Sequence, residues 1–226
     1  MQKEDRPIHF SVELIHPPFS LNKEAIQKLY TELLGTKAKY DSIDLSFPMQ
    51  ARFYTNHGNK SQSIILFLPD RALITEEWTI ITFSDFLEKT EILLPKILKA
   101  RNQSLFLAHI GTIRSTFGLT GYQDAKTFIV EKLLHQTPAS LIDYFGRSVS
   151  TVGIRFVFPE SNETPGLLHI AIESFRHNKK EVFVEVRGIF SKHPITPNSV
   201  KPLLENLKAL RDFLTNRVQY FLSQFD

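Results

Sequence analysis

Apolar and polar positions along the chain predict the same order of elements twice. In the first stretch, alternation with period two predicts strands over 8–15, 40–47, 52–55 and 63–68, the last of which resumes over 72–78. Apolar residues at helical spacing predict helices over 22–34 and 82–101. The expected order in this stretch is therefore β-α-β-β-β-α.

The second stretch repeats this order. Strands are predicted over 105–117, 152–158, 168–172 and 182–190, and helices over 123–135 and 199–224. The strand over 152–158 places Val152, Ile154, Phe156 and Phe158 on one side, so that side is fully apolar. In the closing helix apolar residues recur at steps of three and four, and Pro202 lies in its first turn, where a missing N–H costs little.

These elements predict an α+β fold built from two successive β-α-β-β-β-α units, residues 1–103 and 104–226, packed together as one globular unit. Strands that alternate cleanly need only one buried face, so antiparallel sheets covered by helices on one face are expected. The duplication is inferred from element order alone, because no matching sequence motif repeats. Chance similarity of element order is the alternative explanation.

Composition narrows the class of protein. Hydrophobic residues make up 42% and charged residues 23% of the 226 residues, which is typical of a folded soluble chain. The 19 phenylalanines suit pleated sheet surfaces, and the lack of cysteine excludes disulfides, thiolate nucleophiles and cysteine-ligated metals. No apolar stretch approaches the roughly 18 residues of a membrane span, so we expect a cytoplasmic protein without a membrane partner.

Features of the second half resemble a known family. They are the segment Val152-Gly153-Ile154-Arg155-Phe156, the pair Gly121-Tyr122 before a predicted helix, and the closing hairpin and helix. Together they resemble a sporadically distributed family of uncharacterised bacterial α+β proteins, which carry an Ile-Gly-Leu-Arg-Tyr strand after a Gly-Tyr helix start. This sequence departs from several of those letters. The resemblance implies a bacterial source and an unassigned role, and it carries no catalytic residues over to this chain.

Motifs for cofactors and metals are incomplete. The segment Gly35-Thr36-Lys37 lacks the earlier glycine of a phosphate-binding loop, and 118–121 lacks the full dinucleotide fingerprint. None of the eight histidines has the spacing of a paired metal ligand, and His109 and His169 are expected at ordinary strand positions. The sequence therefore predicts no catalytic residue, no cofactor and no metal site.

Acidic pairs within single strands do not form an acid–base site. Asp41 and Asp44 are expected on opposite faces of a regular strand, and the neighbours Glu76 and Glu77 also point apart. A larger charged set shares one predicted sheet face: Arg155, Glu173, Glu185 and Arg187. We expect these four to form cross-strand ion pairs worth ~0.2–1 kcal/mol each. A ligand-binding cleft with Arg155 as its anion anchor is the alternative.

Basic residues gather in one turn and on the closing helix. The net charge of +3 is mild and is not by itself typical of a nucleic-acid-binding protein. A solvated charged face is therefore expected. The alternative is contact with nucleic-acid phosphates through Arg176, Lys179, Lys180, Lys208, Arg211 and Arg217.

The lack of a catalytic constellation favours a non-enzymatic protein-interaction or regulatory module over an enzyme. We expect a protein partner or self-association, for which a symmetric dimer through a sheet edge or through the final helix would fit. Two alternatives stay open. One is nucleic-acid binding through the basic turn and closing helix, and the other is a small-molecule enzyme or ligand-binder with a cavity between the two halves.

Overall fold

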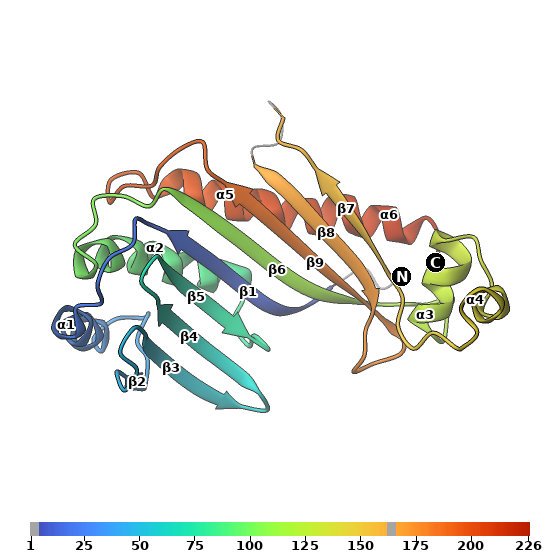
Figure 1. The fold of residues 1–226 in the computed structure, drawn as a ribbon, viewed down its shortest axis with the longest axis horizontal. Coiled ribbons are helices and arrows are strands. Elements are labelled where there is room, and N and C mark those ends of the chain that lie inside the picture. Colours follow the sequence, from blue (N-terminus) through green and yellow to red (C-terminus); the bar gives the residue numbers. More distant parts are fainter. Residues whose placement is uncertain (1–4, 162–165) are drawn as a thin grey trace.

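One large sheet organises the molecule (Figure 1). The structure is a computed structural model that describes residues 5–161 and 166–226. Each of its nine strands runs antiparallel to its neighbours. Their spatial order is β2 (Ser42–Asp44), β3 (Ala51–Gly58), β4 (Ser61–Phe67), β5 (Arg71–Glu77), β1 (Arg6–Ile15), β6 (Ala108–Gly118), β9 (Glu181–Phe190), β8 (Leu167–Ser174) and β7 (Gly153–Phe158).

Strands β1 and β6 join the two halves of the chain. They pair along most of their length, with Phe10 opposite Ile113 and Val12 opposite Gly111. The antiparallel α+β architecture is confirmed, whereas the expectation of a sheet in each half is replaced by one continuous sheet. The physical reason is that two central strands with free edges satisfy their backbone donors and acceptors by pairing with each other.

Helices cover one face of this sheet, as Figure 1 shows. They are α1 (Lys23–Leu33), α2 (Phe83–Ala100) and α5 (Lys201–Asp212), which continues into the π-helical segment η2 (Phe213–Val218) and α6 (Gln219–Ser223). Phe10, Val12 and Leu14 of β1 point toward these helices and are fully buried. The helices of the described residues are all too short or too polar to cross a bilayer.

Two glycines let α5 approach the sheet closely. Gly111 of β6 and Gly188 of β9 are opposite each other in the register. A Cβ at Gly111 would stand 2.6 Å from Leu210 Cδ1 and 2.7 Å from Leu207 Cδ2, and a Cβ at Gly188 would stand 2.7 Å from Leu210 Cδ2. Because carbon atoms do not pack at such distances, the leucines occupy the space that two side chains would need.

Some elements differ from their expected ranges. The helix α4 (Pro138–Phe145) is not predicted by the sequence pattern, since its eight residues contribute none to the core. The helix expected over 123–135 is divided into α3 (Ala125–Phe128) and the π-helical segment η1 (Ile129–Leu133). The helix α2 continues past Pro95 as a single element.

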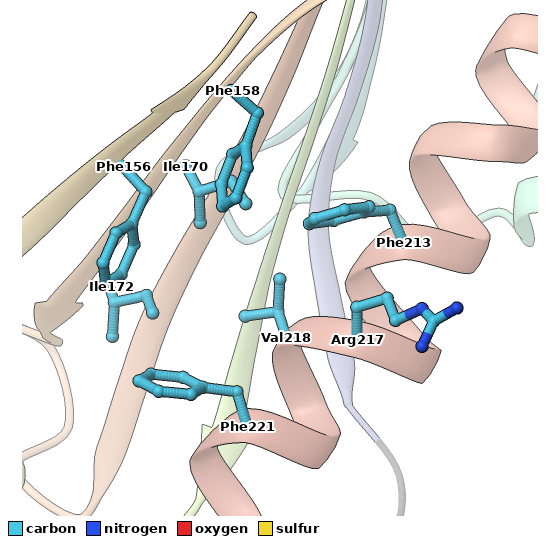
Figure 2. Close-up of a pocket in the computed structure, with 8 residues that line it drawn as sticks. All are labelled: Phe156, Phe158, Ile170, Ile172, Phe213, Arg217, Val218 and Phe221. Atoms are coloured by element: carbon cyan, nitrogen blue, oxygen red, sulfur yellow. The ribbon is translucent and has the colours of Figure 1, made fainter. Parts of the chain in front are cut away.

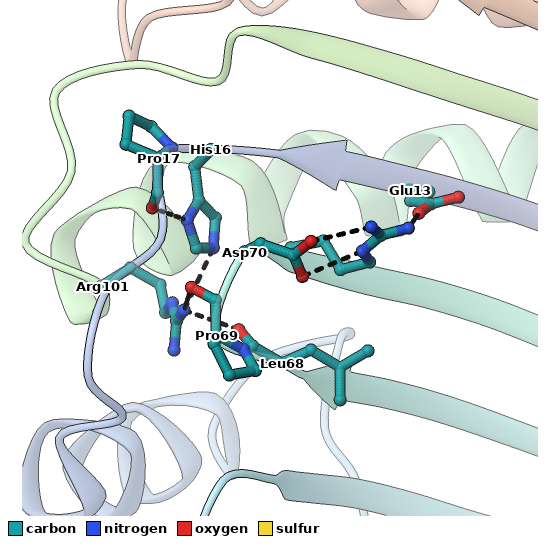
Figure 3. Close-up of polar contacts among 8 residues, drawn as sticks. Glu13, His16, Pro17, Leu68, Pro69, Asp70 and Arg101 are labelled. Atoms are coloured by element: carbon teal, nitrogen blue, oxygen red, sulfur yellow. Dashed lines mark hydrogen bonds and ion pairs between the residues drawn. The ribbon is translucent and has the colours of Figure 1, made fainter.

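A buried arginine ties the end of α2 to the sheet (Figure 3). Arg101 is 1% exposed, and its Nη2 donates to the carbonyl oxygens of Leu68 at 2.7 Å and Pro69 at 3.1 Å. The same nitrogen lies 3.1 Å from Nε2 of His16, whose Nδ1 lies 2.8 Å from the carbonyl oxygen of Pro17. Burial lowers the pKa of His16, so the neutral ring accepts from the guanidinium at Nε2.

Candidate functional site

An open apolar cleft lies between the outer strands of the sheet and the closing helix (Figure 2). Its volume is about 340 Å³. We call it the aromatic cleft, and it is lined by Phe156, Phe158, Ile170, Ile172, Phe213, Arg217, Val218 and Phe221. Figure 2 shows the guanidinium of Arg217 directed away from the rings, so the interior is apolar. Such a surface binds apolar groups and supplies no reactive group of its own.

The spacing of the phenylalanines explains how the cleft forms. Phe156 and Phe158 lie two positions apart on β7 and therefore point to the same side. The ring of Phe156 lies 6.1 Å from Phe221 and the ring of Phe158 lies 5.7 Å from Phe213, both edge to face. These contacts leave Phe156 37% exposed, Phe158 40% exposed and Phe221 36% exposed. The cleft is therefore apolar surface that this chain leaves partly uncovered.

The strand above this cleft is an edge of the sheet. Within the described residues β7 pairs with β8 alone, so one row of its backbone N–H and C=O groups has no strand beside it. It contains no proline and carries one charged side chain, Arg155, while Val157 is 54% exposed. At the same end of the molecule α4 exposes Ile142, Tyr144 and Phe145. Proteins usually protect edges with charge, proline or a covering element, and β7 has little such protection.

The charged set predicted from the sequence lies on the sheet face opposite the helices. Arg155 and Glu185 belong to one cross-strand row, with a residue of β8 between them. Glu173 lies two residues after the β8 member of this row, and Arg187 lies two residues after Glu185 on β9. All four side chains therefore share this face, as alternation predicts. Of the four, Glu185 forms an ion pair, and its partner is Arg114 at 2.7 Å rather than another member of the set. None of the four lines the aromatic cleft, which opens on the other face.

The basic residues of the nucleic-acid hypothesis lie on two elements. The turn between β8 and β9 holds Arg176, Lys179 and Lys180, whereas α5 and η2 hold Lys208, Arg211 and Arg217. Figure 1 shows this turn at the ends of the strands and α5 crossing behind the sheet. Arg211 already forms a two-pronged ion pair with Asp5, at 2.6 and 2.7 Å. The six side chains therefore do not act as one set of free cations.

The first half contains a buried polar cluster that the sequence pattern does not indicate. Glu76 is 2% exposed and accepts hydrogen bonds from Ser63 Oγ at 2.5 Å and Lys89 Nζ at 2.7 Å. His57 Nε2 lies 2.8 Å from the same hydroxyl, beside a cleft of about 550 Å³. Both carboxylate oxygens are occupied, so Glu76 is a satisfied ion pair rather than a free general base. As expected, Glu77 points to the other sheet face, where its carboxylate bonds a histidine.

The histidines expected in strands lie there. His169 is in β8, and His109 is in β6 with its ring stacked 4.9 Å from Phe190 and its Nε2 3.2 Å from Asn206 Nδ2. Burial lowers the pKa of His109 to about 4, so its ring is neutral near pH 7. No three histidine, aspartate or glutamate side chains in residues 5–161 and 166–226 are grouped to hold a metal ion.

Comparison with known proteins adds no family assignment. No protein-family model matches the chain, and no curated protein matches it.

Proposed function

We propose that this chain is a non-enzymatic interaction module that associates with a second copy of itself through β7. The observation that carries the proposal is the position of an unprotected strand edge beside an aromatic cleft. An edge strand of this kind is a template for a further strand. Partly exposed aromatic rings at the centre of a surface are typical of the residues that dominate binding energy in protein interfaces.

The sequence of β7 favours a second copy of the chain as the occupant. An antiparallel edge strand can pair with itself about a two-fold axis. If Phe156 lies opposite its copy, Ile154 lies opposite Phe158 and Arg155 lies opposite Val157, so no like charges meet. The aromatic clefts of the two chains then adjoin across the axis, and each covers rings that the other leaves exposed.

A change of charge on β7 tests this dimer. The variant Val157→Lys places a lysine opposite Arg155 of the second copy, and the two-fold axis gives two such pairs. Because like charges opposite each other repel, we expect the dimer to dissociate. Light scattering at micromolar concentration should give twice the chain mass of 26.1 kDa for the unaltered protein and the single mass for this variant. The double variant Arg155→Glu with Val157→Lys restores opposite charges and should restore the dimer.

The matched control is Ile80→Lys, which introduces the same charge at a position 67% exposed in the first half. It should remain a dimer. A monomeric unaltered chain, or a Val157→Lys variant that stays dimeric, contradicts the proposal. A monomer whose cleft binds a hydrophobic dye would also contradict it, because the cleft would then be free for a different partner.

We also propose that the two halves derive from a duplicated unit. In each half the first strand lies at the centre of the sheet, the next strand along the chain lies at the outer edge, and each later strand lies one place further inward. From the centre outward the five strands of the first half have the order β1-β5-β4-β3-β2, and the four of the second half have the order β6-β9-β8-β7. A helix then follows the last strand of each half. The bacterial source, the cytoplasmic location and the nucleic-acid alternative stay predictions of the sequence.

A further inference from the structure

A second cleft, separate from the aromatic cleft, gathers positive charge. It lies between the start of α3, the segment before β7, and the turn between β8 and β9, and its volume is about 250 Å³. We call it the cationic cleft, and its polar lining includes three cations and three hydroxyls: Lys126, Arg176, Lys179, Ser150, Thr151 and Ser174. No residue lines both clefts.

The backbone around the cationic cleft is held in place by hydrogen bonds. The N–H of Ala125 donates to the carbonyl oxygen of Lys179 at 2.7 Å, which fixes α3 against the turn. The side chain of Asn178 accepts from the N–H of Lys180 at 3.1 Å and so shapes the turn itself. The cations are therefore carried by segments whose relative positions are fixed.

The positive charges of this cleft are not neutralised within the described part of the chain. Lys126, Arg176 and Lys179 have no ion-pair partner there, and the one polar contact of their charged groups is from Lys126 Nζ to the carbonyl oxygen of Val149 at 3.4 Å. The one carboxylate of the lining, Asp124, accepts the N–H of Lys126 at 2.8 Å as a helix cap. Three cations face one anion, so the cleft carries net positive charge.

We infer that the cationic cleft binds the terminal phosphate of a small phosphorylated ligand. A phosphate monoester carries a charge near −2 and three acceptor oxygens, which match three cations and neighbouring hydroxyl donors better than the two oxygens of a carboxylate do. The guanidinium of Arg176 is suited to a two-pronged contact with such a group. Phe175 supplies the apolar part of the lining, and the small volume fits a phosphate with a compact organic group.

Calorimetric titration with ribose 5-phosphate and with inorganic phosphate tests the site. We expect saturable binding that weakens about tenfold or more in Arg176→Gln, because a charge-assisted hydrogen bond is lost. Lys179→Gln should weaken binding in the same direction. The matched control is Lys180→Gln, which removes the same charge from the adjacent residue outside the cleft lining and should change the affinity less than about twofold. Circular dichroism establishes that each variant is folded.

The source of the phosphate is distinguished with a single-stranded oligonucleotide carrying either a 5′-phosphate or a 5′-hydroxyl. Binding that requires the 5′-phosphate supports the site and identifies a nucleic-acid end as an accepted source. The inference is overturned if the two oligonucleotides bind equally, or if no phosphate probe binds. It is also overturned if Lys180→Gln and Arg176→Gln lower the affinity for phosphate by the same factor. The dimer proposed through β7 involves other residues, so its failure would leave these results unchanged.

Discussion

Arg101 has the largest fully buried side chain among the described residues, although its guanidinium carries a charge. No carboxylate accepts from it among the described residues. Two backbone carbonyl oxygens and the neutral ring of His16 lie against it instead (Figure 3). Nε and Nη1 have no hydrogen-bond partner within residues 5–161 and 166–226, and burial lowers the pKa of the guanidinium. A buried cation without a paired anion persists where strong carbonyl acceptors replace water, and here they connect α2 to two strand ends.

His109 gives a prediction about acid stability. Its folded-state pKa is about 4, below the usual histidine pKa of 6.5 that applies to the unfolded chain, so the unfolded state binds more protons between these values. The stability contributed by the neutral ring is complete above pH 6.5 and is lost as the pH falls toward 4. One pKa unit corresponds to about 1.4 kcal/mol, so the loss is about 3 kcal/mol.

Urea denaturation at several pH values measures this loss. In His109→Gln the free energy of unfolding should fall less between pH 6.5 and 4 than in the unaltered protein. His193→Gln, which removes an exposed histidine, is the control, and its free energy of unfolding should fall as much with pH as that of the unaltered protein. The same fall in all three proteins would contradict the assignment of the proton to His109.

At the scale of elements, the contact between α5 and the sheet depends on Gly111 and Gly188. Helices usually pack on a sheet through side chains of both layers, whereas here the leucines of α5 reach the backbone of β6 and β9. The pair lies on two neighbouring strands of the second half, of which β6 also pairs with β1 of the first half. The closing helix is thereby held against the sheet next to the join between the halves.

Gly111→Ala should therefore destabilise the protein. The added methyl group would overlap Leu210 and Leu207 of α5, and overpacking of this kind costs about 1–3 kcal/mol. Chemical denaturation should show a lower midpoint with an unchanged slope. Gly35→Ala is the control, because a Cβ there meets nothing within 4 Å. Equal midpoints for Gly111→Ala and the unaltered protein would contradict the packing described.

At the scale of the whole molecule, the continuous sheet makes the two halves one structure. The central pair β1 and β6 is flanked on both sides, so neither half can unfold without exposing a long strand edge. The single tryptophan, Trp78 at the end of β5, lies 6.3 Å from Phe175 and 5.4 Å from His177 of the second half. It therefore reports on contact between the halves.

We expect the whole chain to unfold in one transition. Trp78 fluorescence and far-ultraviolet circular dichroism should give the same urea midpoint, because loss of the contact and loss of the sheet are coupled. The comparison is made with a Val157→Lys monomer as well, so that dissociation and unfolding are separated. A circular dichroism curve with two steps would mean that the halves fold independently.

The sequence by itself determined the elements with strong periodicity. Alternation in β7, β8 and β9 and the apolar stripe of the closing helix are local properties of the chain, so their position and facing follow from residue order. The shared face of Arg155, Glu173, Glu185 and Arg187 follows for the same reason. The short helix α4 contributes nothing to the core and gave no comparable signal.

The tertiary structure alone decided how these elements meet. Pairing of β1 with β6 joins residues about a hundred positions apart, and no local pattern indicates which free edges will pair. The same holds for the aromatic cleft, where Phe156 and Phe158 reach Phe213 and Phe221 across the fold, and for the buried contact of Glu76 with Lys89. Periodicity specifies which side of an element is buried, whereas the partner on that side is set by packing of the whole chain.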